Sequence, residues 1–240
     1  MHTMSRNIGE GRGRIGRVLA GLAVAVVVAG CSATQQEAPQ LAGGNCALIP
    51  QSTCAQLTPG PSGGAGVRYI APNVPWAQYN KILLNPVTAW GSEKTKVSGA
   101  DLQELTNYLY NVVAKKLGEK YQLVDQPGPG VLRLQFAITD AETATPALRS
   151  VSMIVPQARV LATLKYAATG TYPFVGGAQG ELLATDSVTG NVLAAAVDRR
   201  VGGGSMSTAA QWQWGDAENA MNKWADLCVT RLQDLQAGKS

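Results

Sequence analysis

Histidine is almost missing from this 240-residue chain: its single copy, His2, lies within the first 30 residues. Residues 31–240 therefore cannot form a Ser-His-Asp or Cys-His catalytic group, a histidine general base, or a His-ligated zinc or copper site. We expect no enzymatic activity, no metal ion and no bound cofactor in this part of the chain.

An excess of one charge is also missing once the N-terminal residues are set aside. The chain has 20 Lys and Arg against 16 Asp and Glu, and residues 1–30 hold four of the basic residues and one of the acidic ones. Residues 31–240 therefore carry 16 basic and 15 acidic residues, a net formal charge of +1. Because nucleic-acid binding needs a concentrated basic face, we expect no nucleic-acid partner.

The apolar run near the N-terminus is too short to cross a bilayer. Val18–Ala29 has 12 residues, which as a helix span roughly 18 Å against roughly 30 Å of hydrocarbon. Four arginines precede this run, and Val28-Ala29-Gly30-Cys31 at its end resembles the bacterial lipobox, whose cysteine takes a diacylglycerol. This order of features predicts a lipoprotein signal peptide over residues 1–30 and a covalent lipid on Cys31. The alternative is an ordinary signal peptide that ends near a cysteine.

The predicted lipid also predicts a location. Two or three acyl chains hold a protein stably at a membrane. Residue 32 is Ser rather than the Asp that commonly retains lipoproteins in the inner membrane. The resemblance to the lipobox therefore favours the outer membrane, with the folded part facing the periplasm.

The other three cysteines differ in their surroundings. Cys46 and Cys54 enclose a short polar segment and can meet, so we predict a disulfide between them; otherwise both are free thiols in a mobile tether. Cys228 lies on the apolar stripe of a predicted helix, which indicates a buried, inert thiol. No CxxC spacing exists, so zinc binding by these sulfurs is not expected.

Composition and periodicity divide the mature chain. Residues 31–66, rich in Ala, Gln, Gly, Pro and Ser, are predicted to be a flexible tether, and 67–240 a single domain. Helical spacing predicts helices over 99–118, with a capping box at Ser98, and over 215–236. Strands are predicted at 81–88, 121–124, 132–139, 172–185 and 191–200, with two short helices broken at Pro156 in 146–168. The expected fold is α+β, a mainly antiparallel sheet with helices packed on one face, in the order β-α-β-β-(αα)-β-β-α.

Several phrases of the sequence are similar to those of a known family. They are Tyr79–Leu84 (YNKILL), Pro127–Leu134 (PGPGVLRL) and Val197–Arg200 (VDRR), together with the lipobox. With them the chain resembles, over 58–236, the proteobacterial lipoprotein family called domain of unknown function 3313. The resemblance implies an envelope lipoprotein and no enzymatic activity, and it does not extend to the segment of Cys46 and Cys54.

Charged residues near strand ends are the first candidate sites. Alternation places Asp198 and Arg200 on one face of a central strand and Arg199 on the other. One interpretation is that these three residues form an anion or partner site. The alternative is that they form structural ion pairs, which fix the strand end to a loop or to helix 99–118. Asp140 and Glu142 share a face and could be the carboxylates of an envelope hydrolase, although such pairs are common at strand ends. Trp212 and Trp214 either form a binding platform or fix a helix start to the core.

The second candidate site is an apolar segment at 146–168. Its side chains Val151, Ile154, Leu161 and Leu164 are accompanied by basic residues and no acidic one. This pattern favours an interfacial helix or a docking face, and the alternative is two core helices. We therefore expect a membrane-anchored interaction module with an envelope protein partner. The alternatives are a structural subunit of an envelope transport or secretion complex and, more remotely, a hydrolase.

Overall fold

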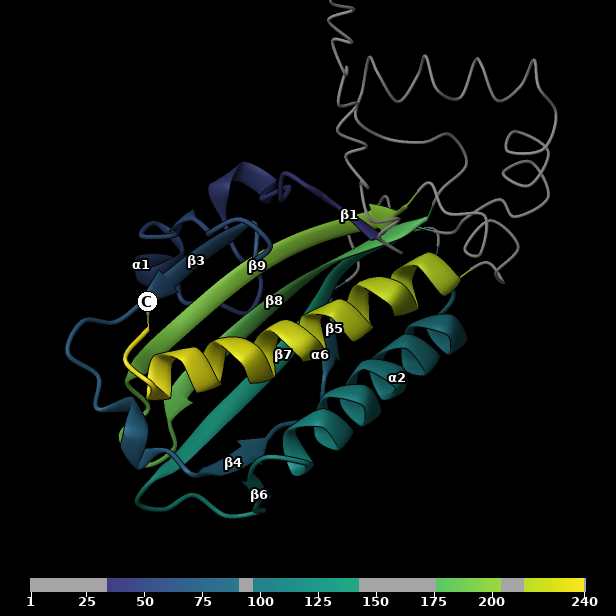
Figure 1. Ribbon diagram of the computed structural model, residues 1–240. Coiled ribbons are helices and arrows are strands. Elements are labelled where there is room, and N and C mark those ends of the chain that lie inside the picture. Colours follow the sequence, from purple (N-terminus) through teal and green to yellow (C-terminus); the bar gives the residue numbers. More distant parts are fainter. Residues whose placement is uncertain (1–33, 91–96, 143–175, 204–213, 240) are drawn as a thin grey trace, which may run out of the picture. The chain divides into compact units, whose positions relative to one another are not determined.

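The computed structural model describes residues 34–90, 97–142, 176–203 and 214–239, all of which belong to one compact unit. The chain is α+β, as predicted, with two long helices on one face of a mainly antiparallel sheet (Figure 1). The expected helices at 146–168 lie outside the described residues. No helix in the described ranges is long and apolar enough to cross a membrane.

Three long strands form the centre of the sheet. They are β7 (Val131–Glu142), β8 (Gly177–Asp186) and β9 (Val192–Gly202), joined in antiparallel register. On β7, Leu132, Leu134, Phe136 and Ile138 are buried on the helix side, as their alternation predicts. The turn between β8 and β9 closes with Gly190 at φ 73°, a conformation that favours glycine.

Shorter strands extend the sheet on both sides. The order is β2-β3-β9-β8-β7-β4-β6, and β1 (Thr34–Glu37) also pairs with β9. β2 (Thr58–Pro59) and β3 (Val67–Ile70) are antiparallel, whereas β4 (Lys81–Leu84), β5 (Thr88–Ala89) and β6 (Gln122–Leu123) make parallel pairs. The strand predicted at 81–88 is interrupted between Leu84 and Thr88, at Pro86, which cannot donate to a ladder.

The two long helices have the predicted bounds. α2 (Gly99–Gly118) begins after Ser98, whose hydroxyl accepts the Asp101 N–H over 3.1 Å, and buries Leu105, Leu109, Val113 and Leu117. α6 (Gly215–Gln236) buries Ala217, Met221, Trp224, Cys228 and Leu232. They pack side by side and share a core with β4, β7, β8 and β9 (Figure 1).

A second core covers the other face of the sheet, and it comes from the segment predicted to be a tether. Residues 34–66 contain β1, the short helix α1 (Gln51–Cys54) and β2, so the prediction of a flexible tether is wrong there. Ile49 and Cys54 pack on Leu183, Ala195 and Val197 of β8 and β9. β9 is therefore apolar on both faces because each face has its own core.

Candidate functional site

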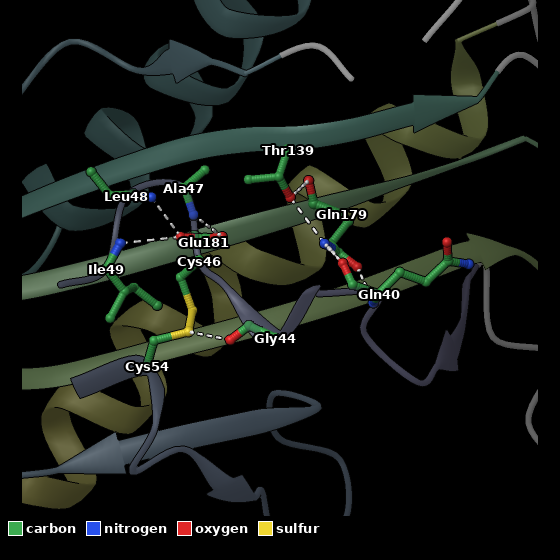
Figure 2. Close-up of a disulfide and its surroundings, with 10 residues drawn as sticks. All are labelled: Gln40, Gly44, Cys46, Ala47, Leu48, Ile49, Cys54, Thr139, Gln179 and Glu181. Atoms are coloured by element: carbon green, nitrogen blue, oxygen red, sulfur yellow. Dashed lines mark hydrogen bonds between the residues drawn. A yellow bond between two sulfur atoms is a disulfide. The ribbon is translucent and has the colours of Figure 1, made fainter. Parts of the chain in front are cut away.

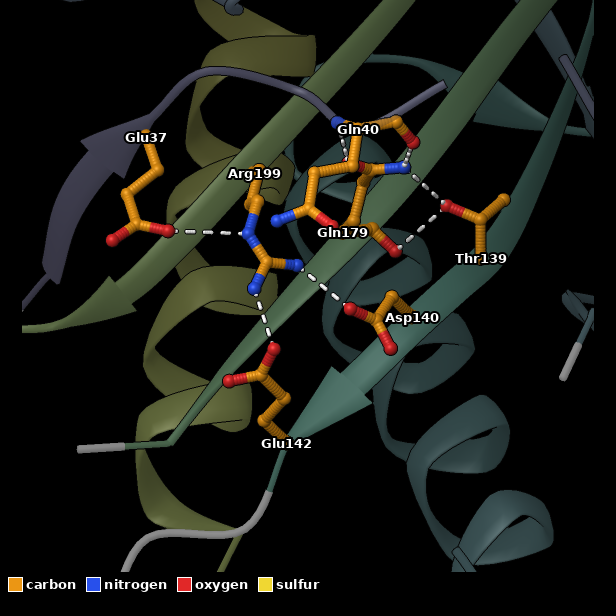
Figure 3. Close-up of polar contacts among 7 residues, drawn as sticks. All are labelled: Glu37, Gln40, Thr139, Asp140, Glu142, Gln179 and Arg199. Carbon is orange, nitrogen blue, oxygen red and sulfur yellow. Dashed lines mark hydrogen bonds and ion pairs between the residues drawn. The ribbon is translucent and has the colours of Figure 1, made fainter. Parts of the chain in front are cut away.

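Four charged side chains meet at the end of the sheet where β1, β7 and β9 lie close together, and we call them the Arg199 cluster. Arg199 on β9 binds Glu37 of β1 and both Asp140 and Glu142 of β7 (Figure 3). The distances from its guanidinium nitrogens to the three carboxylates are 3.2, 2.7 and 2.6 Å, respectively. Only 4% of Arg199 is exposed. Each of its three guanidinium nitrogens therefore donates to a carboxylate of the same chain.

The electrostatics of this cluster fix the charge of the arginine. Burial by itself lowers the pKa of Arg199, but the hydrogen bonds that it donates to Glu142 and Asp140 outweigh this effect and raise the pKa above its usual value. Of the three carboxylates that bind Arg199, that of Glu142 is the most exposed, at 52% of its side chain.

A second group of polar side chains lies on the opposite face of β9, and we call it the Asp198 cluster. Asp198 Oδ2 accepts from Arg200 Nε at 2.6 Å and from Trp224 Nε1 at 2.9 Å. Asp198 Oδ1 accepts from Gln36 Nε2 at 2.6 Å and from the Gly66 N–H at 2.9 Å. Both charged residues are about 95% buried. This ion pair therefore has the hydrogen bonds that a buried charge needs.

The two clusters decide between the alternatives for Asp198, Arg199 and Arg200. Alternation predicted that Arg199 lies on one face of β9 and that Asp198 and Arg200 lie on the other, and the hydrogen bonds of the two clusters agree with this prediction. The residues form structural ion pairs, so the reading as an open anion site is wrong for this arrangement. Their partners lie on β1, β7, the loop before β3, and α6, rather than on helix 99–118.

Asp140 and Glu142 also differ from the geometry of a hydrolase. A glycosidase holds its two carboxylates on opposite sides of the bond to be cleaved. Here both carboxylates bind the same guanidinium from one strand. Within the described ranges, no group of three metal-ligating side chains is arranged for a metal ion.

The strand ends around the Arg199 cluster lie in one register row. Gln35 of β1 is paired with Val201 of β9, Val201 with Gly177 of β8, and Gly177 with Glu142 of β7. The start of α6 lies at the same end, since Asp216 accepts the Gly176 N–H over 2.9 Å. The segments 143–175 and 204–213 therefore begin and end at this edge. Cys31 precedes β1 by only three residues.

Two buried polar side chains of β8 were not predicted. Glu181 accepts the consecutive N–H groups of Ala47, Leu48 and Ile49 at 2.9, 2.8 and 3.2 Å (Figure 2). Gln179 pairs with both backbone groups of Gln40, at 2.6 and 2.9 Å. The sequence shows Gln179 and Glu181 within an otherwise apolar strand. It does not show their backbone partners, because these lie more than 130 positions away.

The cysteines and tryptophans also have defined places. Cys46 and Cys54 form a disulfide beside Glu181 (Figure 2), and Cys228 is a buried free thiol. Trp214 is 1% exposed and so belongs to the core, while Trp212 lies outside the described residues. The side chains Val151, Ile154, Leu161 and Leu164 lie outside them as well.

Comparison with known proteins gives the chain a family. Residues 51–228 match the protein family of unknown function DUF3313, and the chain belongs to it. No curated protein sequence matches the chain.

Solved structures with partial similarity include a PelC dodecamer from Paraburkholderia phytofirmans, at 8% identity and a TM-score of 0.34 over 65% of this chain and 95% of that one. Protein XCC0632 from Xanthomonas campestris matches at 13% identity and 0.37, over 71% and 93%. A neuraminyllactose-binding hemagglutinin homologue from Helicobacter pylori matches at 10% and 0.33, over 65% and 83%. Scores this low assign no role to the chain.

Proposed function

We propose that this member of the DUF3313 family is a lipoprotein of the outer membrane whose folded part faces the periplasm and binds a second envelope protein close to the bilayer. The observation that carries the proposal is the position of Cys31, three residues before Thr34. Three extended residues span about 10 Å. A lipid on Cys31 would therefore hold the end of the sheet with the Arg199 cluster near the membrane surface.

The described residues that flank the proposed docking segment lie at that same end. Val151, Ile154, Leu161 and Leu164 belong to the stretch between Glu142 and Gly176. Both flanking positions lie at the edge where β1 begins. An apolar stretch with only basic charges suits a surface that is partly apolar and partly acidic. The contact surface for the partner would then lie beside the anchor.

The edges of the sheet favour this segment over strand addition. β2 and β6, at the two ends of the strand order, have two residues each, and β2 contains Pro59, which has no N–H to donate. Short edge strands with proline are poor templates for pairing with another chain. Strand addition at β2 or β6 is therefore not the docking mode that we propose.

The anchor is tested by metabolic labelling with palmitate. We expect Cys31→Ser to abolish labelling and Cys228→Ser, the control, to leave it unchanged. Outer-membrane fractions from a density gradient should contain the wild-type protein. Labelling that persists in Cys31→Ser would contradict the anchor, and recovery only in inner-membrane fractions would contradict the location.

The docking segment is tested by crosslinking mass spectrometry in the native envelope. The double variant Leu161→Ser/Leu164→Ser should lose a crosslinked partner while keeping its melting temperature, and Leu123→Ser, an exposed leucine of β6, should keep both. If the double variant melts several degrees lower, the two leucines are core residues and the proposed surface is wrong. Crosslinks only between copies of this chain would favour the structural subunit instead.

A further inference from the structure

An apolar cavity of about 130 Å³ lies between α6 and the sheet, and neither core fills it. Its walls come from the inner face of α6 and from β3, β7, β8 and β9, and they include Leu182, Ala194, Ala196, Trp76, Trp224 and Leu227. Nearly all of the wall atoms are apolar. Empty apolar cavities of about 150 Å³ take up a ligand of the size of benzene, so the space suits part of one alkyl chain.

Small side chains on the sheet produce the cavity. Ala184, Ala194 and Ala196 lie on the α6 side of β8 and β9, and their small side chains leave space beneath α6. α2 packs against α6 on the side of β5 and β6, far along the strand order from β3 (Figure 1). Ile70, Leu182, Ala194 and Ala196 consequently remain only partly buried.

One register row of the sheet leads from the core through the cavity to its mouth. Phe136 of β7, Leu182 of β8 and Ala196 of β9 are paired in turn, and Ala196 is paired with Arg68 of β3. Residues paired across a sheet have their side chains on the same face. The row therefore runs from a buried aromatic ring to a guanidinium at the outer side.

The charged lining residues are three basic ones, Arg68, Arg231 and Lys239, and three acidic ones. The acids are Glu181, Asp198 and Asp234, and the carboxylate of Glu181 accepts the N–H groups of Ala47, Leu48 and Ile49. Asp234 is paired with Arg231 at 3.3 Å, and Asp198 already receives four hydrogen bonds in the Asp198 cluster. The side chains of Arg68 and Lys239 have no ion pair within the described parts of the chain. Two positive charges therefore remain to bind an anion.

We propose that this cavity binds a single-chain anionic amphiphile, with the alkyl chain beneath α6 and the anionic head group on Arg68. The site is independent of the docking segment and of the lipid on Cys31. The carboxylate of a fatty acid matches the guanidinium fork, and the apolar volume takes part of one alkyl chain. It has no room for a second chain.

The test uses the mature lipoprotein in nanodiscs and the quenching of tryptophan fluorescence by 9,10-dibromostearate, because Trp76 and Trp224 line the cavity. We expect saturable quenching in the wild type, and at least tenfold weaker binding for Ala196→Leu, which fills the space. Ala194→Leu provides a second filling variant should the first fail to fold. Equal quenching in the wild type and in a folded filling variant would place the probe in the bilayer and overturn the proposal.

The head group is tested with the methyl ester of the same probe. The wild type should bind the acid at least tenfold more tightly than the ester, Arg68→Gln should bind both equally, and Lys120→Gln, an exposed cation on another surface, should behave as the wild type. No preference for the acid in the wild type would overturn the role of Arg68. Quenching by brominated phosphatidylglycerol but not by dibromostearate would overturn the assignment to a single chain.

Discussion

Trp224 of α6 donates its indole N–H to the carboxylate of Asp198 on β9, with 2.9 Å between Nε1 and Oδ2. The same oxygen accepts from Arg200, and the other oxygen of Asp198 accepts from Gln36 of β1. One carboxylate therefore links α6, the end of β9 and β1. The ring of Trp224 also explains why residue 180 is a glycine, because a Cβ added at Gly180 would be 2.8 Å from the ring. Helix and sheet therefore approach closely where the Asp198 cluster lies.

Loss of the Asp198 carboxylate should lower stability markedly. In Asp198→Asn the buried Arg200 loses its counter-charge, which costs about 3–5 kcal/mol of unfolding free energy. Trp224→Phe, which removes one hydrogen bond to a charged acceptor, should cost about 1.5–3 kcal/mol. Urea titration measures both. Asp226→Asn, the control, breaks only the exposed pair with Lys116 and should cost less than about 1 kcal/mol of unfolding free energy. An equally small loss of unfolding free energy in Asp198→Asn would contradict the prediction.

The disulfide between Cys46 and Cys54 should stabilise the second core. The chain-entropy relation for a loop of about nine residues gives about 2.5 kcal/mol. We expect Cys46→Ser/Cys54→Ser to lower the unfolding free energy by that amount, and reduction of the wild type to have the same effect. Reduction should leave the double variant unchanged. A non-reduced peptide map in which either cysteine is alkylated in the native protein would refute the bond.

The turn between β8 and β9 should weaken in acid. The N–H of Thr189 is the main cause that lowers the pKa of Asp186 in the folded protein, and the hydroxyl of Tyr79 acts in the same direction. A lowered folded-state pKa stabilises the fold at pH values above the unfolded pKa of about 3.9, and this stabilisation is lost as the pH falls through the folded pKa.

We therefore expect Asp186→Asn to be less stable than the wild type at pH 7, with the difference shrinking below about pH 4. Thermal unfolding across this range measures it. Asp125→Asn, an exposed aspartate in another loop, provides the control. A difference that stays constant down to pH 2 would show that the Asp186 carboxylate is not responsible.

Cys228 should be inert in the native protein. Burial raises the pKa of its thiol to about 12, so only about one molecule in ten thousand carries the reactive thiolate at pH 8. We expect no alkylation by iodoacetamide in the native protein and complete reaction in urea, measured by intact mass. Rapid native alkylation at residue 228 would contradict its burial.

Local patterns predicted the parts of the fold whose contacts are local. α2 and α6 have sustained helical stripes, so their bounds and buried faces followed from periodicity. The alternation in β7 predicted its buried face, but the strand continues to Glu142, three residues beyond the predicted end at 139. Residues 34–66 have no such period, and their apolar side chains bury themselves against strands more than 130 positions later. Composition carries no information about such distant contacts, so the segment was predicted to be a tether.

The charged residues show the same division. Alternation assigned Asp198 and Arg199 to opposite faces of β9, but nothing near them in the sequence identifies Glu37, Gln36 or Trp224 as partners. The cavity beneath α6 was not predicted either. It arises because Ala194 and Ala196 of β9 have small side chains that leave space beneath α6.

The pairing of β1 with β9 also has a consequence for the timing of folding. Glu37 and its partner Arg199 are separated by 162 positions, so the first strand synthesised has no partner until most of the chain exists. Contacts of such long range make folding slow, because loop closure precedes any gain from the contact. An exported chain, as proposed above, would benefit from this delay, because it stays extended while it passes through a translocation channel. Among the described strands, the one closest to Cys31 is thus the one whose partner residues are synthesised last.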